Sequence, residues 1–85
     1  MIFGKEREAL TRLPVPKGSV LDGYECYKII NGKRTWRDPE GRFFQWDGYH
    51  GEIEVYNARG RHIAVWNLGG EIIKDAVKGR KIDVS

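Results

Sequence analysis

Hydrophobic and polar residues alternate in short runs along most of the chain, and turns rich in glycine, asparagine and proline separate the runs. Alternation with a period of two residues is typical of β-strands that bury one face. It predicts six strands, at residues 24–30, 33–37, 42–47, 52–58, 62–67 and 72–77. The short turns between them predict a meander, folded as one strongly twisted antiparallel sheet.

Residues 1–23 follow a different pattern. Within residues 5–13, Ala9, Leu10 and Leu13 form an apolar stripe that predicts a short N-terminal helix. Pro14 and Pro16 end this helix and begin a connector that runs to residue 23. We therefore predict an α+β fold that is mainly β, in a single domain of residues 1–85. Helix and connector occupy residues 1–23, and a β-meander carrying the active site occupies residues 24–85.

The composition agrees with a small β-rich domain. Eleven glycines, three tryptophans and four tyrosines in 85 residues favour strands joined by tight turns. No apolar run approaches the ~20 residues of a membrane span, and the N-terminus lacks the apolar core of a signal peptide. The single cysteine, Cys26, excludes an internal disulfide and a zinc site built from several cysteines, and we expect it in the core.

The distribution of charge indicates an anionic partner more clearly than the net charge of +3 does. The basic residues form three clusters: Lys33, Arg34, Arg37 and Arg42; Arg59 and Arg61; and Lys78, Arg80 and Lys81. Three carboxylates, Asp47, Glu52 and Glu54, lie close together in mid-chain. Carboxylates surrounded by cations suggest an anionic substrate that is brought to an acid–base site.

The hairpin of residues 42–58 carries these carboxylates. A four-residue loop at residues 48–51 would set the apolar pairs Trp46–Ile53 and Phe44–Val55 on one face. The opposite, exposed face would hold Asp47 across from Glu52 and Gln45 across from Glu54, with Tyr56 further along. Like-charge repulsion on such a face costs stability. A fold seldom keeps a carboxylate cluster without a compensating cation or a function.

His50 adds an imidazole to the cluster. RNA can be cut without a metal because its own 2′-hydroxyl is the nucleophile. An enzyme must then remove that proton, protonate the departing 5′-oxygen and stabilise the phosphorane. A carboxylate and an imidazole are suited to the two proton transfers, and the planar fork of an arginine matches phosphate oxygens. The sequence offers all three groups.

Simpler interpretations stay open for these residues. His50 can simply be a solvent-exposed loop residue, and Glu52 and Glu54 can lie on the solvent-exposed face of an edge strand. Asp47 can serve only to cap the turn by accepting backbone N–H groups.

The aromatic residues and the second histidine have their own alternatives. Trp46 and Trp66 are expected in the core, whereas Trp36 is evenly balanced between the core and a base-stacking platform. His62, at the start of a strand, is expected to be structural rather than catalytic.

The central motif resembles that of a known family. The residues concerned are Gly32-Lys33-Arg34, Trp36, Asp38, Gly41-Arg42, Trp46-Asp47, His50-Gly51-Glu52, Glu54, Tyr56, Ala58, Gly60, His62 and Arg80. In type and spacing they are similar to the C-terminal killing domain of ribosome-inactivating colicins, cloacin and related pyocins, over residues 32–82. Tyr49 and the pair Phe43-Phe44 depart from the family pattern.

The resemblance implies a catalytic set of Asp47, His50, Glu54 and Arg80. In such domains the glutamate is the general base, the histidine is the general acid and the arginine steadies the phosphate, with no metal and no cofactor. The implied reaction cuts 16S rRNA at the ribosomal decoding site and leaves a 2′,3′-cyclic phosphate. The resemblance also implies an acidic immunity protein as a partner, and a secreted or delivered toxin that acts in the target bacterium's cytoplasm.

Further residues around this set are expected to bind the substrate. They are Lys33, Arg34, Trp36, Arg37, Arg42, Glu52, Tyr56, Arg59, Lys78 and Lys81. Two other functions remain open: a ribonuclease of similar shape that cuts tRNA or mRNA, and a non-catalytic β module that binds RNA or protein. The β module would not depend on Glu54. A metal-dependent nuclease is not expected, because the two histidines are isolated and the ligand spacing of a metal site is missing.

Overall fold

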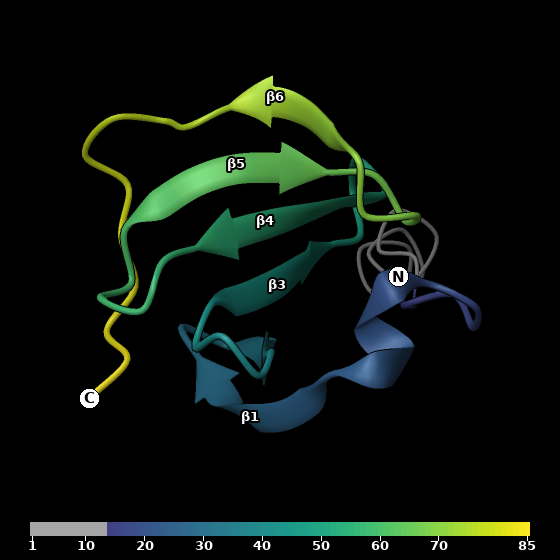
Figure 1. Cartoon of the computed structure of the whole chain (residues 1–85), viewed down its shortest axis with the longest axis horizontal. Coiled ribbons are helices and arrows are strands. Elements are labelled where there is room, and N and C mark those ends of the chain that lie inside the picture. The colour runs from purple at the N-terminus through teal and green to yellow at the C-terminus, as the bar shows by residue number, and fades with distance from the viewer. Residues whose placement is uncertain (1–13) are drawn as a thin grey trace, which may run out of the picture.

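The structure, a computed structural model, describes residues 14–85, which form one six-stranded antiparallel sheet. Each strand pairs with the next one along the chain, so the sheet is a meander with β1 and β6 at its edges (Figure 1). The strands are β1 (Glu25–Ile30), β2 (Lys33–Arg37), β3 (Phe43–Asp47), β4 (Glu52–Tyr56), β5 (His62–Trp66) and β6 (Ile72–Asp75). All six predicted strands are confirmed, with ends that differ from the prediction by at most two residues.

The described part of the chain is mainly β. Its helical structure is one turn of 3-10 helix, η1 (Val20–Gly23), within the segment predicted as a connector. Ser19 begins this turn, because its hydroxyl oxygen accepts the N–H of Leu21 and so caps a free backbone donor. The predicted helix at residues 5–13 lies outside the described residues.

The hairpin register follows from the turns. Asn31 and Gly32 both have positive φ, at 53° and 75°, as a two-residue turn between twisted strands requires. At the β3–β4 turn, the N–H of Gly51 donates to the carbonyl of Asp47 over 2.8 Å and closes the four-residue loop. The predicted cross-strand pairs are all confirmed: Phe44–Val55, Gln45–Glu54, Trp46–Ile53 and Asp47–Glu52.

One face of the sheet carries the main core. Phe44, Ile53 and Val55 are fully buried there, and Trp66 packs against them. Leu21, from the 3-10 turn, closes this core because the segment before β1 crosses the same face (Figure 1). Alternation along β3 and β4 thus buries the apolar side chains that the period-two pattern assigned to one face.

The opposite face is also buried over much of its area, which corrects the prediction that it is exposed. The residues after β6, here called the C-terminal segment (76–85), return past the β4–β5 turn (Figure 1). Ile82 from this segment packs with Ile30, Phe43 and Tyr56. Gln45 is buried beside them and donates to the carbonyl of Ile30. Glu54 keeps only 6% of its surface exposed.

The burial of Cys26 and of the three tryptophans can be compared with the predictions. Cys26 is exposed rather than in the core, because it lies on the edge strand β1, and no further strand of residues 14–85 pairs with its outer side. Trp36 is 8% exposed and belongs to the main core. Trp66 is buried as predicted, whereas Trp46 packs against the core and is partly buried.

No helix within residues 14–85 is long and apolar enough to cross a membrane.

Candidate active site

Asp47 and His50 form a tight pair in the β3–β4 turn. The Nδ1 atom of His50 lies 2.7 Å from Oδ2 of Asp47, while Oδ1 of Asp47 accepts the N–H groups of Tyr49 and His50. Burial disfavours the charged carboxyl, but these hydrogen bonds outweigh it and lower the pKa of Asp47. The carboxylate of Asp47 therefore both caps the turn and orients the ring of His50. His50 itself is exposed, with its second ring nitrogen, Nε2, on the side away from Asp47.

Glu52 joins this pair from the start of β4. One atom from each of Asp47, His50 and Glu52 lies within 4.8 Å of the others, so the fold gathers a possible metal-ligand set that sequence spacing did not indicate. Imidazole nitrogen and carboxylate oxygen suit a divalent transition metal. All three already have partners, because Nδ1 of His50 and Oδ2 of Asp47 contact each other and Glu52 accepts from Lys74 over 3.0 Å. A metal bound through these same atoms would displace these contacts.

Glu54 lies further along β4 and is held between two basic groups. Its Oε1 atom accepts from Nη1 of Arg80, which reaches it from the C-terminal segment. The same oxygen lies 3.1 Å from Nε2 of His62, at the start of β5. The side chain of Glu54 is 8% exposed and that of His62 is fully buried, whereas that of Arg80 is 47% exposed. Residues from three segments thus meet around one buried carboxylate.

His62, expected to be structural, lies at the site, and its contact with Glu54 is what sequence reasoning missed. The N–H of Val77 donates to its Nδ1 over 2.9 Å, so Nδ1 must carry a lone pair. The neutral ring then has its proton on Nε2, which faces Glu54 without the alignment of a full hydrogen bond. Burial lowers the pKa of His62, and Arg80 lowers it further against the opposing effect of Glu54. The signal in the sequence was its position on the strand that pairs with β4.

Further buried polar groups lie near Glu54, on β3 and at the end of β4. Gln45, directly across from Glu54, donates to Oγ1 of Thr35 over 3.1 Å. Tyr56 is 3% exposed, and burial together with the charge of Glu54 raises the pKa of its hydroxyl, with Arg80 acting in the opposite direction. Tyr56, expected to bind substrate, therefore lies beneath the site as a neutral phenol.

The two groups of ionisable residues lie on the same face of β4. Glu52 and Glu54 alternate with buried Ile53, so their Cα atoms are about 7 Å apart, two steps of roughly 3.3 Å. The Asp47–His50 pair stands at one end of this interval, and the Glu54–Arg80–His62 group at the other. This arrangement can place one proton donor and one proton acceptor on opposite sides of a bound phosphate.

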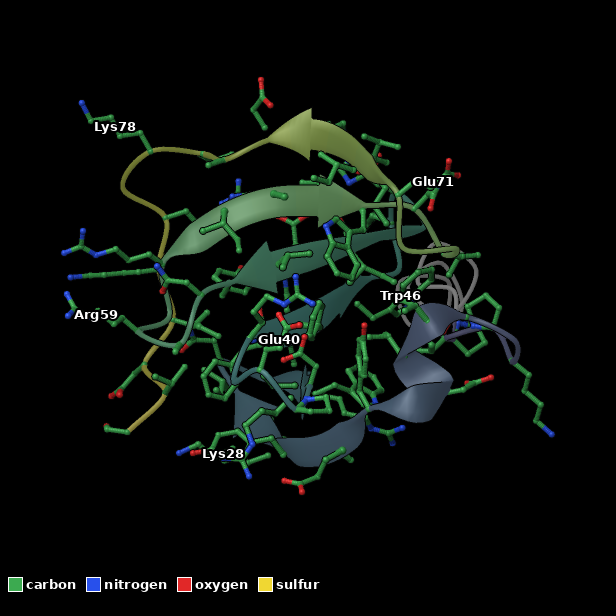
Figure 2. All side chains as sticks on the ribbon, in the orientation of Figure 1. Lys28, Glu40, Trp46, Arg59, Glu71 and Lys78 are labelled. Atoms are coloured by element: carbon green, nitrogen blue, oxygen red, sulfur yellow. The ribbon has the colours of Figure 1, made fainter. Side chains whose placement is uncertain are left out.

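Exposed cations flank the site at both ends. Figure 2 shows Arg59 and Lys78 pointing outward at the end of the sheet where the C-terminal segment passes the β4–β5 turn. Arg61 and Lys81 are paired across that junction and are also exposed. At the Asp47 end is a groove of about 740 Å³, and its lining includes Asn31, Lys33, Arg34, Trp36, Asp47 and Tyr49.

Three of the predicted substrate-binding residues have other surroundings. Nε of Arg42 lies 2.7 Å from Oδ2 of Asp38, and its guanidinium stands 5.2 Å from the ring of Trp66, on the core face. Arg37 is paired with Glu25 over 2.8 Å. The structure does not bring these two arginines to Glu54. Trp36 is largely buried, with the guanidinium of Arg34 at 5.8 Å from its ring, so it offers little free surface to a base.

Comparison with protein families gives one match that covers most of the site. A family model described as "Cytotoxic" matches residues 28–83, which is 56 of the 85 residues. The matched range begins in β1 and contains every residue of both ionisable groups. A search of curated proteins finds no match.

The position of His62 makes a testable prediction about its protonation. Its ring should titrate below the ordinary pKa of 6.5 and carry its neutral proton on Nε2, because Val77 donates to Nδ1. Nitrogen and carbon NMR of the two imidazoles measures both properties, and a His50→Asn variant assigns the signals, because the chain has two histidines. A pKa of His62 above 6.5, or a proton on Nδ1, would contradict this geometry.

The same shift has a consequence for stability. Because the folded-state pKa of His62 lies below the unfolded one, the neutral ring stabilises the fold fully above pH 6.5. That contribution is lost as the pH falls from the unfolded value through the folded one. In a His62→Gln variant, chemical denaturation should therefore find a shallower decrease of the unfolding free energy below pH 6.5 than in the wild type. His50→Asn serves as the comparison at the exposed ring.

Proposed function

The chain belongs to the Cytotoxic family, and from this premise we propose that it is a colicin-type toxin domain with metal-independent endoribonuclease activity. The proposed substrate is 16S rRNA in the assembled ribosome, cut at the decoding site. The observation that carries the proposal is the buried carboxylate of Glu54, held by Arg80 and His62 on the same face of β4 as Glu52, whose cross-strand partner Asp47 contacts His50.

Glu54 is the proposed general base. Its carboxylate is ion-paired with Arg80, and the ring of His62, whose pKa is lowered by burial, does not compete for the proton. Glu54 takes the proton of the 2′-hydroxyl, and the 2′-oxygen forms a new bond to phosphorus. Burial of Glu54 excludes most water, which strengthens its interaction with the substrate hydroxyl.

His50 is the proposed general acid. Asp47 holds Nδ1 and orients the ring, so Nε2 is the nitrogen that can give its proton to the 5′-oxygen as the phosphorus–oxygen bond breaks. The exposure of His50 suits this role, because the leaving strand must depart into solvent. The products are a 2′,3′-cyclic phosphate and a free 5′-hydroxyl.

Arg80 is the proposed partner of the phosphorane. One of its five N–H donors is committed to Glu54, and its side chain is 47% exposed, so other donors can face a phosphate. As the 2′-hydroxyl proton reaches Glu54, the attraction between Glu54 and Arg80 weakens. The guanidinium then becomes a better partner for the charge that develops on phosphorus.

The cations at both ends of the site are proposed to hold the RNA backbone. Among residues 14–85, no carboxylate forms an ion pair with Lys33 or Arg34 in the groove, or with Arg59, Lys78 or Lys81 at the other end. This surface would equally suit an acidic inhibitor, in line with the immunity protein that the resemblance implies. We propose that the toxin is secreted or delivered and acts in the cytoplasm of the target bacterium.

The first test is cleavage mapping on purified ribosomes, with tRNA and mRNA as competing substrates. We expect one cut in 16S rRNA, and roughly 10²–10⁴-fold slower cleavage by Glu54→Gln and by His50→Ala, the usual effect of losing one acid–base group. Glu25→Gln is the matched control, because Glu25 is exposed at the far edge of the sheet and its one ion pair within residues 14–85 is with Arg37.

The outcomes separate the alternatives. Cuts confined to tRNA or mRNA would replace the proposed substrate and keep the chemistry. RNA binding with no cleavage by the wild type, and no effect of Glu54→Gln on binding, would leave a non-catalytic RNA-binding module.

Metal dependence is tested at the Asp47–His50–Glu52 group. We expect cleavage to continue in excess EDTA, because the proposed steps use only side chains and the RNA itself. Activity that is lost in EDTA and restored by zinc or magnesium would assign that group as a metal site and overturn the mechanism.

RNA binding by the groove is tested through its salt dependence. On an inactive Glu54→Gln background, Lys33→Ala and Arg34→Ala should each reduce the log–log salt slope of binding by ~0.7, the value for one phosphate contact with a single strand. Arg42→Ala should leave the slope unchanged, because Asp38 already neutralises Arg42 on the core face. An effect of Arg42 equal to that of Lys33 would contradict the assignment of RNA binding to the unpaired cations of the groove.

A further inference from the structure

The backbone that carries Arg80 forms a closed turn. The N–H of Arg80 donates to the carbonyl of Val77 over 3.1 Å, and Gly79 between them has a φ of 86°. The turn is exposed to solvent on its outer side. It has no regular strand pairing, so contacts with another segment must fix its position.

The β4–β5 turn supplies those contacts. The N–H of His62 donates to the carbonyl of Arg80 over 2.9 Å, and the N–H of Ile82 donates to the carbonyl of Gly60 over 2.8 Å. Arg61 and Lys81 pair between these two bonds in an antiparallel bridge. Figure 1 shows the C-terminal segment running beside this turn before it reaches the chain end. The β4–β5 turn therefore holds the carbonyl of Arg80 and, two residues later, the N–H of Ile82.

Gly60 allows the two segments to approach this closely. It is buried and has a φ of 84°, a conformation that side chains rarely adopt. A Cβ atom there would overlap the carbonyl oxygen of Ile82 and would lie 3.2 Å from its carbonyl carbon. Backbone atoms cannot rotate away as the end of a side chain can. A side chain at position 60 must therefore displace the C-terminal segment.

We propose that Gly60 is a positioning residue for Arg80, acting through its contact with Ile82. The inference rests on the proposed ribonuclease function and deepens it. Ile82 is anchored in the second core cluster, and Arg80, two residues earlier, directs its guanidinium to Glu54. A shift of the segment away from Gly60 moves the guanidinium out of line with Glu54 and with the phosphorane. An error of about 1 Å in such a position can lower a rate by about 10².

Gly41 provides a matched control for Gly60. Its φ is 85°, so alanine causes the same kind of backbone strain at both positions. The nearest atom to an added Cβ at Gly41 is Cβ of Ala58, at an ordinary contact distance of 3.8 Å. The difference between Gly60→Ala and Gly41→Ala therefore isolates the displacement of the C-terminal segment.

The experiment measures single-turnover cleavage at saturating ribosomes for Gly60→Ala and Gly41→Ala, each also combined with Arg80→Ala. We expect Gly60→Ala to lower the saturated rate by about 10², with little change in affinity, and Gly41→Ala to leave it close to wild type. On the Arg80→Ala background, Gly60→Ala should have almost no further effect, because the group that it misplaces is already gone. An equal loss on both backgrounds, or equal rates for the two glycine variants, would overturn the proposal.

A second readout does not depend on RNA. The Arg80 Nε–H signal in NMR, identified by its loss in Arg80→Ala, should shift and exchange faster in Gly60→Ala but not in Gly41→Ala. An unchanged signal in Gly60→Ala would overturn the proposal even if the protein cuts no RNA. If Gly60→Ala does not fold, Ile82→Ala removes the anchor while keeping Gly60, and it should reproduce the loss of rate and the altered Arg80 signal. Wild-type rate and signal in that variant would contradict the inference.

Discussion

The carboxylate of Glu54 is the constraint on which the rest of this small structure depends. A charged group that is 8% exposed needs partners, because desolvation would otherwise favour the protonated acid or an unfolded chain. Alternation along β4 directs Glu54 to the face away from the main core, where the residues directly across from it, Gln45 and Val65, are uncharged. His62, from the start of β5, contributes a ring whose pKa is lowered by burial. The cation for Glu54 must therefore come from outside the sheet. The return of the C-terminal segment across this face supplies that cation.

His62 connects this electrostatic requirement to the backbone. Its ring contacts Glu54 through Nε2 and accepts Val77 through Nδ1, while its own N–H donates to Arg80. One residue therefore touches the carboxylate and fixes both ends of the turn that carries the matching arginine. Such closure suits a chain of 85 residues, in which a core alone gives modest stability. The buried Glu54–Arg80 pair, which is costly to remove from water, therefore lies where the proposed chemistry needs a preorganised base and cation.

Sequence reasoning reached the parts of the site that depend on local rules. A four-residue turn and period-two alternation were sufficient to give the register of β3 and β4, and with it the shared face of Asp47, Glu52 and Glu54. They were not sufficient to predict that Glu54 is buried, because its cover comes from 26 residues further along the chain. The role of His62 depends on the same distant segment. The exposure of Cys26 depends on which strand forms the edge of the sheet, a property of the whole meander.

The net charge of +3 does not show which cations are paired with a carboxylate, and only the folded chain distinguishes them. Arg37, Arg42, Lys74 and Arg80 are each paired with a carboxylate, so they add little to the field beyond the surface. The unpaired cations of the described chain include Lys33 and Arg34 at one end of the site and Arg59, Lys78 and Lys81 at the other. An anion approaching this molecule is therefore attracted to both ends of the interval between His50 and Glu54. Arg80 is paired with Glu54, so its charge acts on an anion chiefly when a reacting phosphate competes with Glu54 for it. The cations that attract RNA are therefore different from the one proposed to act on it during the reaction.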